Sequence, residues 1–81
     1  MPHIIVKLYP GRSEEQKIGL VENITTVVSE TLHLNESSIS VAIEEVPSEN
    51  WAKEVYKKDI MDNHEKLYKK PGYIPKENEF E

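Results

Sequence analysis

The chain has 81 residues, of which 37% are hydrophobic and 31% charged, a balance that excludes a multidomain or disordered protein and predicts one small domain over residues 1–81. The formal net charge of −5 disfavours a nucleic-acid-binding surface, and the absence of cysteine excludes disulfide bonds and thiolate chemistry. Because no signal peptide, transit peptide or membrane-length apolar run is visible, we expect a cytoplasmic protein with no membrane partner.

Residues 3–9 have the composition of a largely buried β-strand. They are rich in β-branched and aliphatic side chains and end at the turn formers Pro10 and Gly11. Ser13 is followed three residues later by Gln16, with two glutamates between them. This capping-box pattern predicts a helix that begins at residue 13 or 14, where the acidic side chains complement the helix dipole.

Apolar side chains recur every three or four residues along this predicted helix and give it one apolar face. They are Ile18, Leu20, Val21, Ile24, Val27, Val28 and Leu32. The two-residue alternation over residues 39–43 then predicts a second strand, which ends before Pro47. A strand, a crossover helix and a second strand form a βαβ unit with parallel strands. Because a two-stranded sheet is marginal alone, we expect oligomerisation to extend it.

The C-terminal third predicts a further helix and a polar tail. Ser48 is a candidate cap for a short turn, and apolar and aromatic residues keep a helical spacing from residue 52 to residue 70, where Pro71 and Gly72 end the helix. Residues 73–81 carry three glutamates and few apolar side chains. We expect them to form either a loose tail or an arm docked on a partner chain.

Pro2 has a specific chemical meaning if Met1 is removed, because the mature chain then begins with a free secondary amine. An α-amino group has a reference pKa of about 7.7 to 8.0, which positive charge or an apolar setting lowers toward the value that a general base needs at neutral pH. A position at the start of a strand also holds this amine in place. Pro2 is therefore a candidate catalytic base.

Arg12 is the only arginine among ten basic residues, and it lies between a turn glycine and a helix start. A guanidinium group offers two parallel N–H donors, and a helix start offers unpaired backbone N–H groups. This position therefore predicts a binding site for an anion such as a carboxylate.

These features together resemble the 4-oxalocrotonate tautomerase family. The resemblance is carried by Pro2, by the Gly-Arg-Ser-Glu-Glu-Gln-Lys stretch at residues 11–17, and by the Ser-Ile-Ser-Val-Ala-Ile-Glu-Glu stretch at residues 38–45. It runs from residue 2 to residue 51, and residues 51–73 look like the longer PptA branch of the family, whose members are described as dimeric. A dimer is thus favoured over a hexamer.

The resemblance implies a role for three residues. Pro2 corresponds to the catalytic proline, Arg12 to the arginine that binds a substrate carboxylate, and Trp51 to an aromatic wall that keeps the site apolar. The founding members carry a second arginine where this chain has Ser40. This departure favours a substrate with one carboxylate and an apolar remainder, such as phenylenolpyruvate, over a dicarboxylate.

The histidines carry less weight as site residues. In a regular strand, His3 points to the face opposite Pro2 and Ile4, where a structural or surface role is the more usual one. His33 and His64 are far apart in sequence and lack carboxylates at ligand spacing, so we expect no metal site and no cofactor.

The sequence therefore predicts an α/β fold with a βαβ tautomerase-type unit and a cofactor-independent keto–enol tautomerase, an isomerase that takes a small enol carboxylate. The alternative is a non-catalytic βαβ module that keeps the fold for dimerisation or for binding a small ligand. The state of the N-terminus discriminates between them, because Pro2 behind a retained Met1 has an amide nitrogen and no basic lone pair.

Overall fold

The computed structural model describes all 81 residues, which form two compact units, Met1–Glu45 and Val46–Glu81. The first unit holds β1 (His3–Leu8), α1 (Glu14–Leu32), a 3₁₀ turn over Glu36–Ser38 and β2 (Ser40–Glu45). The second unit holds α2 (Ser48–Trp51), a π-helical segment over Ala52–Met61 and two 3₁₀ turns, His64–Lys66 and Glu77–Phe80. None of the helices has both the length and the apolar character needed to cross a bilayer.

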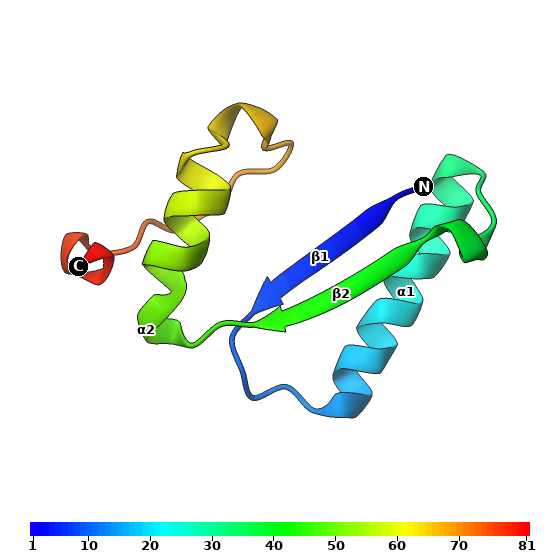
Figure 1. Ribbon diagram of the computed structural model, residues 1–81, viewed down its shortest axis with the longest axis horizontal. Helices are drawn as coiled ribbons and strands as arrows, with labels where there is room; N and C mark the ends of the chain where they lie inside the picture. The colour runs from blue at the N-terminus through cyan, green and yellow to red at the C-terminus, as the bar shows by residue number, and fades with distance from the viewer. The chain divides into compact units, whose positions relative to one another are not determined.

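The first unit is a parallel βαβ unit, as predicted. The strands β1 and β2 pair in parallel over six positions, from His3 opposite Ser40 to Leu8 opposite Glu45. Figure 1 shows the two arrows side by side, with the chain leaving the tip of β1 and returning through α1 to the start of β2. The predicted α/β fold class is therefore confirmed.

Helix α1 begins at the capping box that the sequence predicted. The Ser13 hydroxyl accepts a hydrogen bond from the Gln16 backbone N–H at 3.1 Å, and the Gln16 side chain accepts one from the Ser13 N–H at 3.2 Å. The helix ends at His33, which adopts a left-handed conformation with φ of 57°. Both ends of α1 are thus set by local hydrogen bonds and backbone geometry, before any packing.

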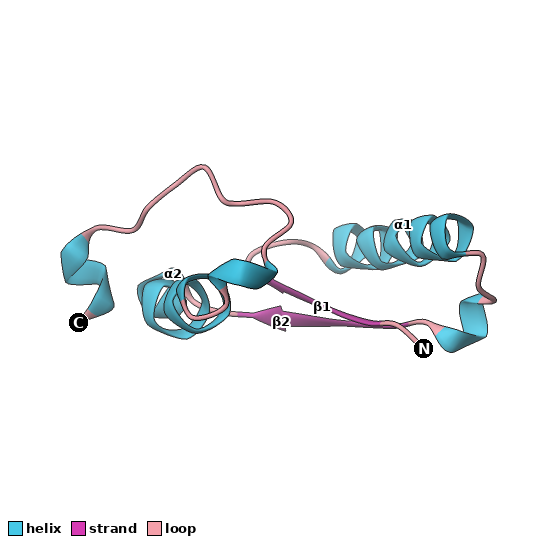
Figure 2. Ribbon diagram, turned by 90° about the horizontal axis from the view of Figure 1, so that it is seen from above, coloured by secondary structure: helices cyan, strands magenta, loops and turns pink.

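Helix α1 covers one face of the sheet, as Figure 2 shows, and leaves the other face without a helix from its own unit. Val21, Ile24 and Val28 of the predicted apolar stripe are half-buried, whereas Ile18 and Val27 stay 55% and 56% exposed. No side chain of residues 1–45 is fully buried. The unit is therefore a thin two-layer structure that leaves part of its apolar surface exposed to solvent.

The second unit corrects the predicted helix over residues 52–70. The helix starts at Ser48, with Pro47 in the capping position and no side-chain cap, so the expected Ser48 cap is absent. It continues in π-helical geometry and stops at Met61, nine residues early. Asn63 donates a hydrogen bond to the Lys58 carbonyl at 2.7 Å, which satisfies an acceptor at the helix end and stops the chain from winding further.

The C-terminal residues also differ from the two expected alternatives of a loose tail and an arm on a partner chain. They pack on their own unit, because the rings of Tyr73 and Phe80 lie 5.4 Å and 6.1 Å from the ring of Tyr56, centroid to centroid. The Tyr56 hydroxyl donates to the Tyr73 carbonyl at 3.3 Å. Aromatic pairing therefore holds a segment whose composition alone predicts little order.

Candidate active site

Pro2 lies immediately before β1 and is half-buried, while Met1 in front of it is 99% exposed. The Pro2 carbonyl oxygen accepts a hydrogen bond from the backbone N–H of Ser40 at 3.2 Å, which extends the parallel pairing by one residue beyond the strands. The residue at the chain start is thus held against the start of β2. Removal of the exposed Met1 would leave the Pro2 nitrogen at a fixed position.

Arg12 lies in the loop between β1 and α1, where it is exposed and makes no hydrogen bond or ion pair. Two acidic side chains of the same unit bind Lys17, whose Nζ lies 2.8 Å from Glu14 Oε1 and 3.4 Å from Glu45 Oε1. The hydrogen bond that Lys17 donates to Glu14, with a smaller contribution from the one to Glu45, raises the pKa of Lys17. The Arg12 guanidinium, which has no partner in the chain, is available to an external anion.

Pro2 and Arg12 lie at opposite ends of β1. Figure 1 shows the N-terminus at the tail of the β1 arrow and the loop that carries Arg12 beyond its tip. Six strand residues at a rise of about 3.3 Å each separate the two positions by roughly 20 Å. The structure therefore does not bring these two predicted site residues together within one chain.

His3 and Ser40 form a side-chain pair beside Pro2 that sequence reasoning missed. The His3 Nδ1 and Ser40 Oγ atoms lie 2.6 Å apart, and the two residues are direct partners in the sheet register. The sequence places each residue at the start of its strand, which is the available signal, but only the register brings them together. The pair puts an imidazole and a hydroxyl group at the end of the sheet where Pro2 lies.

Trp51 belongs to the second unit, where it is the last residue of α2 and half-buried. Its indole Nε1–H donates a hydrogen bond to the Tyr73 hydroxyl at 2.8 Å. The C-terminal segment therefore fixes the orientation of the predicted aromatic wall. Tyr73 is a further residue that was not identified from sequence, because the contact depends on how the tail folds back.

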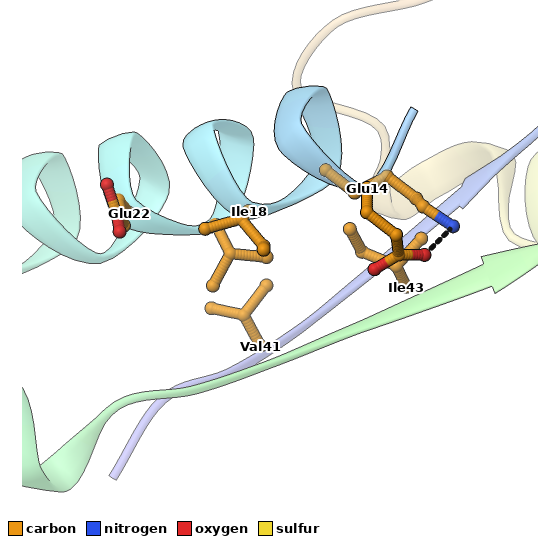
Figure 3. A pocket seen from close by; sticks show the side chains of 7 residues that line it. Glu14, Ile18, Glu22, Val41 and Ile43 are labelled. Atoms are coloured by element: carbon orange, nitrogen blue, oxygen red, sulfur yellow. Dashed lines mark ion pairs between the residues drawn. The ribbon is translucent and has the colours of Figure 1, made fainter. Parts of the chain in front are cut away.

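An open groove of about 340 Å³ runs between α1 and β2, and it is not the site of the predicted residues. Figure 3 shows Val41 pointing from β2 toward Ile18 on α1 and Ile43 lying next to Glu14, with Glu22 farther along the helix. The dashed line in Figure 3 marks the Glu14–Lys17 ion pair. Two carboxylates and an already paired lysine disfavour an anionic substrate here, and no three His, Asp or Glu side chains converge to hold a metal ion.

Comparisons with known proteins identify the family of the chain. The family model described as "Tautomerase enzyme" matches residues 2–59, a span that includes Pro2, Arg12 and Trp51 and crosses the boundary between the two units. A protein named "Probable tautomerase" from Xylella fastidiosa is 44% identical over 73 residues, which cover 90% of this chain and 89% of the relative. Tautomerase PptA from Cronobacter sakazakii is 42% identical over 74 residues, covering 90% and 97%.

The solved structures give the same result. The crystal structure of YwhB, described as a homologue of 4-oxalocrotonate tautomerase, is 44% identical and superposes with a TM-score of 0.58. It covers 59% of this chain and 79% of its own. A second structure, described as apo unfused 4-OT, is 30% identical and superposes with a TM-score of 0.57, covering 58% and 77%.

Proposed function

The chain belongs to the tautomerase family and is an isomerase, and we propose that it is a cofactor-independent keto–enol tautomerase of small enol carboxylates such as phenylenolpyruvate. The observation that carries this proposal is the fixed position of Pro2 at the open start of β1, together with one unpaired arginine. The first supplies a base and the second a carboxylate-binding group.

Pro2 is the general base and acid of the proposed reaction. Once Met1 is removed, its nitrogen lone pair accepts the proton of the enol hydroxyl, and the electrons of the broken O–H bond form the ketone C=O bond. The electron pair of the enol C=C bond then takes a proton from the Pro2 ammonium, so the amine returns to its neutral form. No oxidant, reductant or second substrate is needed for this exchange.

Arg12 binds the substrate carboxylate through its two parallel N–H donors. Because it is the only arginine, a second carboxylate at the far end of the substrate would find no equivalent bidentate partner. This supports a monocarboxylate with an apolar remainder. Trp51 is proposed to pack against that remainder and to exclude water, which strengthens the polar contacts at the reacting atoms.

The separation of Pro2 and Arg12 supports a site completed by two copies of the chain. A small substrate does not span the roughly 20 Å length of β1, so one copy would supply the proline and a neighbour the arginine. The exposed apolar residues on α1 and the two-stranded sheet favour association as well. We therefore propose a homo-oligomer, most simply a dimer, which sedimentation of the processed protein tests directly.

The proposed function is tested by following the ketonisation of phenylenolpyruvate by absorbance. We expect Pro2→Ala to lower kcat by about 10²- to 10⁴-fold, the usual contribution of a positioned acid–base group. Arg12→Ala should act mainly by raising KM, because it removes a binding contact. Equal rates for the wild type and both variants would exclude the proposal and would leave a non-catalytic binding or dimerisation module.

A further inference from the structure

The hydrogen bond between His3 and Ser40 lies on the face of the sheet that α1 does not cover. Val41 and Ile43 line the groove beneath α1, and their register partners are Ile4 and Val6. Because side chains alternate along a strand, His3 and Ser40 point to the opposite face. Both side chains are exposed there, and neither makes any other side-chain hydrogen bond.

Both residues of the pair are directly linked to Pro2, His3 along the chain and Ser40 across the sheet. His3 follows Pro2 directly in the chain, so the two Cα atoms lie about 3.8 Å apart. Ser40 donates its backbone N–H to the Pro2 carbonyl at 3.2 Å. The imidazole and the hydroxyl group therefore belong to the two residues directly linked to Pro2, one through the chain and one through the backbone hydrogen bond.

The hydrogen-bonding capacity of the pair matches one oxygen atom of the proposed reaction. A neutral imidazole carries one donor and one acceptor nitrogen, and a serine hydroxyl carries one donor and two lone pairs. When Nδ1 and Oγ bond to each other in either direction, the pair still offers one donor and one acceptor outward. Because the enol proton goes to the Pro2 nitrogen, the enol oxygen accepts from the outward donor of the pair, and the ketone oxygen that replaces it does the same.

We propose that His3 and Ser40 together bind the oxygen that changes from enol hydroxyl to ketone during the reaction, an assignment that rests on the proposed function. The pair holds this oxygen beside Pro2 through its outward donor. The pair therefore orients the substrate with its carboxylate on Arg12 and its reacting oxygen at the start of the sheet.

Two product-like ligands that differ in this one oxygen test the assignment. Phenylpyruvate carries the ketone oxygen, whereas 3-phenylpropanoate has the same ring, chain length and carboxylate and lacks it. Binding of each is measured by calorimetry on processed wild type, His3→Ala, Ser40→Ala and Ser40→Thr. We expect His3→Ala and Ser40→Ala to weaken phenylpyruvate binding by roughly 3- to 10-fold, the value of one neutral hydrogen bond, with 3-phenylpropanoate unchanged.

Two variants serve as controls. Ser40→Thr keeps the hydroxyl and should bind both ligands like the wild type. Ser37→Ala removes an exposed hydroxyl from the 3₁₀ turn before β2, where its side chain makes no hydrogen bond, and should also change nothing. These controls separate loss of the hydroxyl from a general disturbance of the strand start.

The outcomes distinguish this assignment from the proposed function. If His3→Ala and Ser40→Ala weaken both ligands equally, or weaken neither, while the wild type still ketonises phenylenolpyruvate, the assignment is wrong and the function stands. If the wild type neither ketonises phenylenolpyruvate nor binds phenylpyruvate, the proposed function itself is overturned, and the assignment with it.

Discussion

The backbone N–H of Ser40 lies 3.2 Å from the carbonyl oxygen of Pro2 and donates a hydrogen bond to it. A residue so close to the chain start would otherwise fray, since terminal residues are ordered only when they are tied down. Here the second strand fixes it. A general base gains most when it is held in one orientation before the substrate arrives, so this bond is the structural basis of the role proposed for Pro2.

The role of Arg12 predicts a graded loss of binding. Arg12→Lys keeps the charge but loses the two-pronged geometry, so KM for phenylenolpyruvate should rise by about 10-fold, and Arg12→Ala should raise it by about 100-fold. Steady-state ketonisation kinetics give both values. Lys17→Met is the matched control, because Lys17 already binds Glu14 and Glu45 and should leave KM unchanged. An equal effect of Lys17→Met would mean that general positive charge, and not Arg12, holds the substrate.

The conformation of Gly11 predicts opposite effects of two alanine substitutions. Gly11 has a φ of +116°, which a side chain disfavours even though nothing lies within 4 Å of an added Cβ. Gly11→Ala should lower the free energy of unfolding by about 1 to 3 kcal/mol. Gly19→Ala, inside α1 with equally open space, should raise it by up to about 1 kcal/mol. Urea denaturation at one protein concentration measures both, and a Gly11→Ala variant as stable as the wild type would contradict the strain argument.

The ion pairs of Lys17 predict a loss of stability at alkaline pH. Glu14 and Glu45 raise the pKa of Lys17 above its unfolded value of about 10.4. A raised pKa stabilises the folded state fully at pH values below the unfolded pKa, and the stabilisation disappears as pH rises through the folded one. The stability difference between wild type and Lys17→Met should therefore be constant from pH 7 to pH 9 and shrink above pH 10.5. Denaturation curves across this range measure this difference. A stability difference between the two proteins that grows with pH would contradict the raised pKa of Lys17.

The contact between Trp51 and Tyr73 predicts that the C-terminal segment affects the site. Tyr73→Phe removes the acceptor of the indole N–H, which should lower stability by about 0.5 to 1.5 kcal/mol and alter the fluorescence of the single tryptophan. Because Trp51 then loses this contact, kcat/KM should fall as well. Tyr68→Phe is the control, since Tyr68 is fully exposed and forms no hydrogen bond. Identical spectra for Tyr73→Phe and wild type would show that Tyr73 does not orient the indole.

The sequence was sufficient for the parts of the fold that depend on local chemistry. The capping box at Ser13 and Gln16 located the start of α1, and the period of the apolar residues gave the β1–α1–β2 order. The helix over residues 52–70 was wrong because its apolar spacing continues past Met61, whereas the side chain of Asn63 ends the helix by a hydrogen bond that the period does not reveal.

The parts of the site that escaped prediction depend on pairing between distant residues. His3 was identified as a strand-start residue, but its bond to Ser40 follows from the register of two strands that a helix separates. That Lys17 binds Glu14 and Glu45 while Arg12 has no partner in the chain likewise follows only from the fold. Position and residue type can be read from a sequence, whereas such pairing needs the fold.

The most direct test of the central claim compares two chemically synthesised chains, residues 2–81 and residues 1–81. They share every side chain of the proposed site and differ in whether the Pro2 nitrogen is a free amine or an amide. We expect residues 2–81 to ketonise phenylenolpyruvate with a kcat/KM at least about 100-fold above that of residues 1–81, because an amide nitrogen accepts no proton at neutral pH. Equal values for the two chains would contradict the assignment of Pro2 as the catalytic base.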